Sequence, residues 1–121
     1  MKLIYLAHPI SAFKENGELD KEEMILNEAK ADALGQHLAS LGYAMIVPGN
    51  NTRGWYKRFG FNYDWWLSRA FAIIARCDAI FFAPGWEHSK GCLAEMAFAQ
   101  ENHIKGFTEI ELLKANVPPE G

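Results

Sequence analysis

The sequence is poor in cysteine and carries no block of basic residues. Cys77 and Cys92 are the two cysteines in 121 residues, and they form neither a CxxC pair nor a Cys/His metal spacing. One disulfide is an open alternative, but two free thiols are expected, and no metal. Lys and Arg number 12 against 15 Asp and Glu. A nucleic acid polymer is therefore not an expected partner, because that affinity rests on cations that neutralise phosphates; a single nucleotide is not excluded.

Long apolar runs and the common cofactor motifs are also missing. The apolar run at 2–7 is stopped by Pro9 and is shorter than a signal peptide or a membrane span requires. We therefore expect a cytoplasmic protein that does not bind membranes. The sequence contains no GxxxxGK(S/T) loop, no GxGxxG and no HExxH, so no bound cofactor is expected.

Apolar and amphipathic segments alternate along the chain. Hydrophobic residues make up 50% of the sequence, which suffices for the core of one domain over residues 1–121. Short apolar runs predict strands and longer periodic stretches predict helices. The strands are expected at 2–7, 43–47, 78–83 and 104–108, and the helices at 20–41, 63–77, 92–102 and 109–115. This order is typical of an α/β fold, in which a parallel sheet has helices on both faces.

Three segments would meet at the carboxyl edge of such a sheet, where ligands bind. They are 7–11, 83–91 and the long segment 48–62. The last contains four aromatic residues in its second half: Trp55, Tyr56, Phe59 and Phe61. A loop of this length is often a lid or a wall of a site, and the alternative is a surface loop held down by its aromatic side chains.

Glu95 is the most informative residue of the predicted third helix. The segment 91–99 is apolar nearly all round, which predicts burial on all sides, and Glu95 is the one charged residue in it. A lone buried carboxylate costs several kcal/mol unless it is paired, and proteins keep such groups most often at functional sites. The alternative is a structural carboxylate that holds a loop or a partner subunit.

Other polar groups are predicted at the same edge. Residues 89–91 read Ser-Lys-Gly before a helix, a combination that can bind a phosphate group. The alternative is an ordinary Ser N-cap beside a solvated Lys. The Tyr5 hydroxyl can reach Glu95 if the strand of Tyr5 is adjacent to the strand that precedes the helix of Glu95. Otherwise Tyr5 is a core residue. His8 is an acid–base candidate or a hydrogen-bonding residue of the edge, whereas Asp78 opens the third strand at the opposite edge and is expected to be structural.

Two segments resemble a known family. Residues 5–11 read YLAHPIS, and residues 77–95 contain CDAI, then PGWExSxG, then Glu95. Both are similar to motifs of the nucleoside 2-deoxyribosyltransferase superfamily. The resemblance covers about residues 3–105, and it is greatest to the short members of the superfamily and to the nucleoside 5′-monophosphate N-glycosidases. The resemblance implies a flavodoxin-like or Rossmann-like three-layer sandwich with four to five parallel strands. It also implies a homodimer or a larger homo-oligomer.

The resemblance further implies cleavage of the N-glycosidic bond of a small-molecule nucleoside or nucleotide. The glutamate matching Glu95 is the nucleophile in that family, and the tyrosine matching Tyr5 positions it. Ser89 stands where transferases of free nucleosides often carry Asp and the monophosphate hydrolases carry Ser, which favours a 5′-phosphate. Trp86 or an aromatic residue of 55–66 would stack on the base. The candidate substrate-binding residues are Ala7, His8, Pro9, Ile10, Gly85, Trp86, Ser89 and Gly91.

Two positions depart from the family pattern. Ala70 stands where the family usually has an Asp that acts on the base, and His8 stands where Gly is common. Another group would then have to act on the base. The candidates are Asp64, as a third catalytic residue, His8 or a group of a partner chain. We expect a hydrolase of (deoxy)ribonucleoside 5′-monophosphates, with a deoxyribosyl transferase and a non-catalytic nucleotide-binding module as alternatives.

Overall fold

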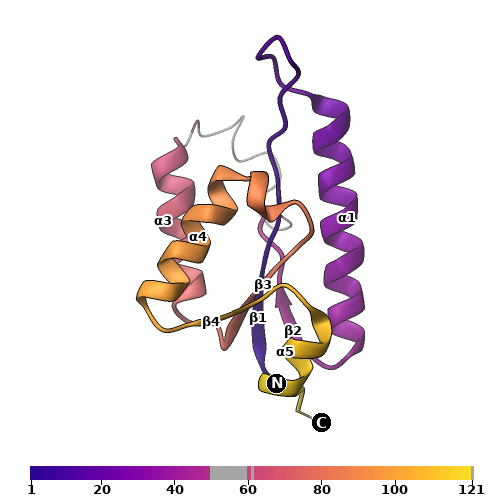
Figure 1. Ribbon diagram of the computed structural model, residues 1–121, viewed down its shortest axis with the longest axis vertical. Coiled ribbons are helices and arrows are strands. Elements are labelled where there is room, and N and C mark those ends of the chain that lie inside the picture. The colour runs from indigo at the N-terminus through magenta and orange to yellow at the C-terminus, as the bar shows by residue number, and fades with distance from the viewer. Residues whose placement is uncertain (50–59, 61, 121) are drawn as a thin grey trace.

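The computed structural model describes residues 1–49, 60 and 62–120 and folds as a parallel sheet between two layers of helices (Figure 1). The strands are β1 (Leu3–Ala7), β2 (Ala44–Ile46), β3 (Ala79–Phe82) and β4 (Lys105–Phe107). The helices are α1 (Lys21–Ser40), α3 (Tyr63–Ile74), α4 (Lys90–Glu101) and α5 (Ile110–Asn116), with a short 3-10 helix η1 (Trp86–His88). Every predicted strand and helix is present, and the ends differ from the prediction by a few residues.

The sheet has the strand order β2-β1-β3-β4, and all its pairings are parallel. At the centre of β1, Tyr5 lies opposite Ile46 of β2 and Ile80 of β3. The chain runs from β1 outward to β2 and then crosses to the other side of β1, so the direction of winding reverses between β1 and β3. This is the doubly wound, flavodoxin-like order, and it confirms the expected fold class with a four-stranded sheet.

Alternate side chains of β1 enter two separate cores. Ile4 and Leu6 pack in a cluster with buried residues of α1 and α5, whereas Tyr5 and Ala7 pack in a cluster with those of α3 and α4. Figure 1 shows these two pairs of helices on opposite sides of the sheet. Because both faces are covered, the strand is apolar at every position rather than at every second one.

The helix ends follow the capping signals of the sequence. The Asp20 side chain accepts a hydrogen bond from the backbone N–H of Glu23 at 3.1 Å, as expected of an N-cap. Gly42 follows the last turn of α1 with a φ of 106°, a conformation that favours glycine. Asn62 caps α3 in the same way, through the N–H of Trp65 at 2.9 Å.

The expectation that the third predicted helix is buried on all sides is wrong. The inward face of α4 consists of Cys92, Glu95 and Ala99, whereas Leu93 is about half exposed. Small residues make the helix apolar in composition, but their side chains have little apolar surface area. Burying one face of the helix is therefore sufficient. The burial of Glu95 itself is confirmed.

Long-range hydrogen bonds fix both ends of the fold. The Asp78 carboxylate accepts a hydrogen bond from the backbone N–H of Leu3 at 2.7 Å, which confirms its structural role at the amino edge of the sheet. The segment after α5 is held as well: the Tyr43 hydroxyl donates to the carbonyl oxygen of Val117 at 2.7 Å, and both residues are buried.

Gly35 of α1 lies so close to Val47 that a methyl group does not fit. A Cβ at position 35 would lie 2.7 Å from Val47 Cγ2. In a free helix Gly→Ala stabilises by about 1 kcal/mol, but here the contact would push α1 away from the sheet. We expect Gly35→Ala to lower the free energy of unfolding by about 1–2 kcal/mol in urea titrations. In the Val47→Ala background the same change should be stabilising, and an equal loss in both backgrounds would refute the contact.

Candidate functional site

The segments after β1 and β2 are joined at the carboxyl edge by His8. The ring Nδ1 lies 2.9 Å from the carbonyl oxygen of Pro9, and Nε2 lies 3.4 Å from that of Pro48. The residue is buried. Both ring nitrogens therefore face backbone carbonyl groups, which corresponds to the edge hydrogen-bonding role rather than to a free acid–base group.

Beneath this edge, Tyr5 and Glu95 form a buried pair. Tyr5 is the third residue of β1 and is 2% exposed, and Glu95 is the sixth residue of α4 and is 7% exposed. The Tyr5 hydroxyl donates a hydrogen bond to the Glu95 carboxyl group. The two residues meet because α4 follows β3, the neighbour of β1, and packs on the face of the sheet to which Tyr5 points. The structure thus brings together the pair that the sequence singled out.

The surroundings of the pair set its protonation. Burial raises the pKa of Glu95 to about 7, against the opposing effect of the hydrogen bond from Tyr5. Near neutral pH this carboxyl group therefore both holds and releases a proton, which suits acid–base or nucleophilic chemistry. The pKa of Tyr5 is raised by burial and by the negative charge of Glu95, so the phenol stays protonated and remains the donor.

Ser89 begins the helix that carries Glu95. Its Oγ accepts a hydrogen bond from the backbone N–H of Cys92 at 3.3 Å, so the residue is an N-cap. A hydroxyl that accepts one hydrogen bond still has its own proton to donate. Beside it, a Cβ at Gly91 would meet Ser89 Oγ at 3.9 Å and no nearer atom. The first turn of α4 therefore has open space next to a hydroxyl and the positive end of the helix dipole.

Arg69 and Tyr63 lie near the pair and Lys90 lies beside Tyr63, although sequence reasoning assigned none of the three a catalytic role. Arg69 of α3 is close enough to Tyr5 for its positive charge to lower the pKa of the phenol. Burial and then the negative charge of Glu95 raise the pKa of Tyr63, the first residue of α3. Lys90 Nζ lies 4.9 Å from the centroid of the Tyr63 ring and so links the starts of α3 and α4. The position of Tyr63 on the first turn of α3 is a signal that could have identified it, whereas Lys90 belongs to the Ser-Lys-Gly segment that the sequence already indicated.

The segments after β1 and β3 touch each other. A Cβ at Gly85 would lie 3.5 Å from Pro9 Cγ, and Gly85 has a φ of 91°. An L side chain at this position would therefore be strained. Ala7, at the end of β1, is buried.

The remaining predicted site residues, Trp86, Ile10 and Asp64, differ in their burial. The Trp86 ring packs on Phe82 with a centroid distance of 5.3 Å and belongs partly to the core. Ile10 and Asp64 are exposed, Ile10 after β1 and Asp64 on the first turn of α3. Asp64 is the next residue in the chain after Tyr63, and its negative charge also raises the pKa of Tyr63.

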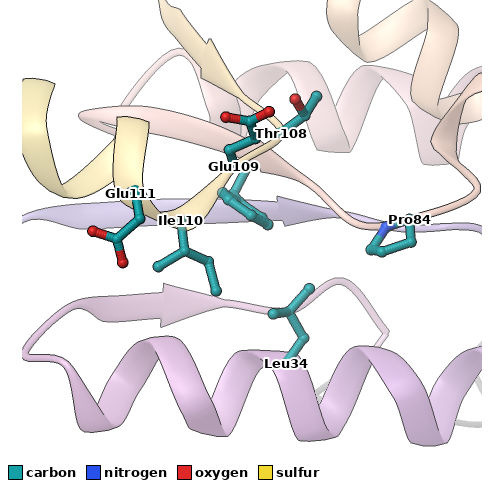
Figure 2. Close-up of a pocket in the computed structure, with 7 residues that line it drawn as sticks. Leu34, Pro84, Thr108, Glu109, Ile110 and Glu111 are labelled. Carbon is teal, nitrogen blue, oxygen red and sulfur yellow. The ribbon is translucent and has the colours of Figure 1, made fainter.

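Two hollows of the described part lie away from the pair. A groove of about 350 Å³ lies between α1 and the start of α5, and Figure 2 shows Leu34 and Ile110 pointing toward one another across it. Its lining consists of Leu34, Phe81, Pro84, Thr108, Glu109, Ile110 and Glu111. A second cavity of about 150 Å³ lies beside β4. Neither is lined by Tyr5 or Glu95, so the candidate site rests on chemistry rather than on the shape of these hollows.

The predicted lid or wall falls outside the described residues, since Trp55, Tyr56, Phe59 and Phe61 lie within 50–59 and at 61. Across 1–49, 60 and 62–120, no group of three or more His, Cys, Asp or Glu is placed to hold a metal ion. The helices of those residues include none with the length and hydropathy needed to cross a membrane. Cys77 and Cys92 are both free thiols.

The raised pKa of Glu95 predicts a pH-dependent cost to the fold. Its value of about 7 lies above the ordinary 4.5, so stability is greatest with the carboxyl group protonated and falls as pH rises from 4.5 through about 7. We expect Glu95→Gln to exceed the wild type in free energy of unfolding by about 3 kcal/mol at pH 9. The difference should shrink as the pH falls below about 7 and be nearly gone at about pH 4.5. Urea titrations measure it, with Glu101→Gln at the exposed end of α4 as the control, and a difference independent of pH would refute the assignment.

Comparison with known proteins assigns the chain to one family. A family model described as a domain of unknown function (DUF4406) matches residues 2–106, a span that contains both Tyr5 and Glu95. No curated protein and no solved structure matches the chain. With the match running from the start of β1 into β4, the chain belongs to the family of the domain of unknown function DUF4406.

Proposed function

We propose that this protein is an enzyme that hydrolyses the N-glycosidic bond of a (deoxy)ribonucleoside 5′-monophosphate. The observation that carries the proposal is the buried Glu95 carboxyl group hydrogen bonded to Tyr5. Burying a carboxylate costs stability, and such a cost is most often kept where the group has a function. The pair also lies below the point between β1 and β3 where the winding of the sheet reverses, which is where folds of this kind bind ligands.

In the proposed reaction, Glu95 is the nucleophile at the anomeric carbon. A carboxylate oxygen bonds to C1′ while the bond from C1′ to the base nitrogen breaks, and that electron pair leaves with the base. Water then attacks C1′, the bond to Glu95 breaks, and the pentose 5-phosphate is released. Tyr5 is a positioning residue, because its hydrogen bond fixes the orientation of the carboxyl group.

The 5′-phosphate would bind at the first turn of α4. Ser89 supplies a hydroxyl there, Lys90 supplies a positive charge, and the open space beside Gly91 admits the phosphate oxygens. The helix dipole favours an anion at the same place. Since Glu95 lies in the next turn of the helix, one element would hold both the phosphate and the nucleophile.

Position 70 also supports a second candidate function. Ala70 packs in the same apolar cluster as Tyr5, so an acid at this position would face the reacting groups, and alanine has no proton to give. In the enzyme, Asp64 or a group of a partner chain would protonate the departing base. Without such a donor, the same edge would serve a non-catalytic nucleotide-binding module.

The remaining features of the proposal rest on the sequence: the location on its short apolar runs, and the ligand and the oligomer on its family resemblance. The ligand is a small phosphorylated molecule, and the protein acts in the cytoplasm as a homodimer or larger homo-oligomer. Transfer of the deoxyribosyl group to a second base would use the same covalent intermediate and differs in the acceptor that attacks C1′.

Release of free base tests the proposed function. Purified protein is incubated with nucleosides and their 5′-monophosphates, with and without a second base, and the products are separated by chromatography. We expect base from monophosphates without an acceptor, at a rate that rises as Glu95 ionises through about pH 7. Glu95→Gln should lower the rate at least about a thousandfold, while Glu101→Gln on the same helix leaves it unchanged. Nucleotide binding without base release would favour the binding module instead.

A charge at the helix cap tests the phosphate position. Asp and Asn both cap helices well, so Ser89→Asp and Ser89→Asn keep the start of α4 and differ in charge. We expect Ser89→Asp to weaken the binding of monophosphates by about tenfold relative to Ser89→Asn. Nucleosides, which lack the phosphate, should respond equally to both changes. Calorimetric titration measures both ligands, and equal effects on nucleosides and monophosphates would show that the phosphate lies elsewhere.

A further inference from the structure

Arg69 brings a positive charge to the candidate site, and the proposed reaction gives it no task. It is the seventh residue of α3 and is partly buried. The next residue, Ala70, is buried in the apolar cluster that contains Tyr5. Arg69 is also close enough to Tyr5 for its charge to lower the pKa of the phenol. Its guanidinium group keeps that charge when it is partly removed from water, because arginine is not deprotonated in proteins.

The rotation of α3 determines on which side of the helix Arg69 lies. α3 and α4 cover the same face of the sheet (Figure 1), and the rings of Phe71 and Phe98 stack between them with centroids 4.3 Å apart. Residues two positions apart on a helix differ by about 200° in direction. Because Phe71 projects toward α4, Arg69 projects to the other side of α3. Glu95 of α4 and Arg69 therefore approach the Tyr5 hydroxyl from different directions.

The positive charge of Arg69 does not neutralise the nucleophile. A guanidinium group paired with Glu95 would hold the pKa of that carboxyl group below its ordinary value. The pKa of Glu95 is instead raised to about 7 by burial, and the effect that opposes this rise is the hydrogen bond from Tyr5. The charge therefore acts on a group of the site other than Glu95.

We propose that Arg69 stabilises the departing base in the hydrolysis proposed above, on which this role rests. In a displacement at C1′ the nucleophile and the leaving group lie on opposite sides of the carbon, so the group that assists departure must approach from another direction than Glu95. The bond from C1′ to the base nitrogen breaks, the electron pair stays on the base, and the guanidinium group stabilises this negative charge. Arg69 keeps its proton. The base takes one from the donor of the proposed reaction, and the attacking water restores it to that donor.

A guanidinium group also selects the kind of base. Its N–H groups form a fork that binds two acceptors on one edge of a base, such as O6 and N7 of guanine. Adenine has an amino donor next to N7, so the same fork meets one acceptor and one donor. The proposed substrate is therefore a 5′-monophosphate whose base has a carbonyl oxygen and a ring-nitrogen acceptor on the same edge.

Base release by Arg69→Met and Arg76→Met tests this role. Arg76 follows the end of α3 and is exposed, so it is the matched control. The wild type should release guanine from its monophosphate at least about tenfold faster than adenine. Arg69→Met should lower guanine release by about a hundredfold, while Arg76→Met leaves it unchanged. The base of 7-methylguanosine 5′-monophosphate is already cationic and leaves as a neutral molecule. With this substrate Arg69→Met should change the rate by less than about threefold.

The outcomes separate the role of Arg69 from the proposed function. An equal loss with the natural and the methylated substrate would mean that Arg69 supports the fold, which overturns its role while the hydrolysis stands. Equal release of guanine and adenine by the wild type would overturn the selection of the base. If Arg69→Met melts below the assay temperature, Arg69→Lys decides, since it keeps the charge without the fork and should lose the preference for guanine. A wild type that releases no base from any monophosphate would refute the hydrolysis itself, and the role of Arg69 with it.

Discussion

The pairing of β1 with β3 is the contact on which the rest of the structure depends. It sets Tyr5 opposite Ile80, and it brings the segments after the two strands together at Pro9 and Gly85. It also fixes where α4 can lie, because α4 begins soon after β3 and packs against the face that carries Tyr5. The buried pair of Tyr5 and Glu95 is therefore a consequence of strand order, and a chain with β1 and β3 apart would not form it.

The stability of the fold and the chemistry of the site oppose each other at Glu95. Burial disfavours the ionised carboxyl group, and the single hydrogen bond from Tyr5 offsets only part of this effect on its pKa. An ionised carboxylate in such a place is most favourable when a positive charge develops beside it. In the proposed reaction, the oxocarbenium-like centre of glycosidic cleavage would supply that charge in the transition state, so the fold would favour the transition state over the ground state.

The sequence allowed the architecture and the central pair to be predicted, because both depend on local patterns. Apolar runs predicted the strands, longer periodic stretches predicted the helices, and a lone charge in an apolar helix indicated Glu95. These signals are carried by residues close to one another along the chain. The predicted aromatic wall lies outside the described residues and stays a prediction.

The features that escaped prediction depend on how elements are rotated and how loops close. The rotation of α3 decides that Arg69 acts on Tyr5, and no periodicity of a single helix specifies it. Trp86 packs on Phe82 because η1 turns back over the core. His8 joins two segments that are 40 positions apart. The one-sided burial of α4 was missed because an apolar composition does not show whether a small residue such as alanine is buried or exposed.

The distance along the chain between the two central strands also governs when the sheet can form during synthesis. Leu3 and Asp78, which are hydrogen bonded at the amino edge, are 75 positions apart. At about 5–20 residues per second, β1 leaves the ribosome about 4–15 s before β3. During that interval its LIYLA segment has β2 as its one possible neighbour in the final sheet. The nascent chain thus presents an apolar strand with one edge unpaired for seconds, and this edge is open to aggregation until β3 is made.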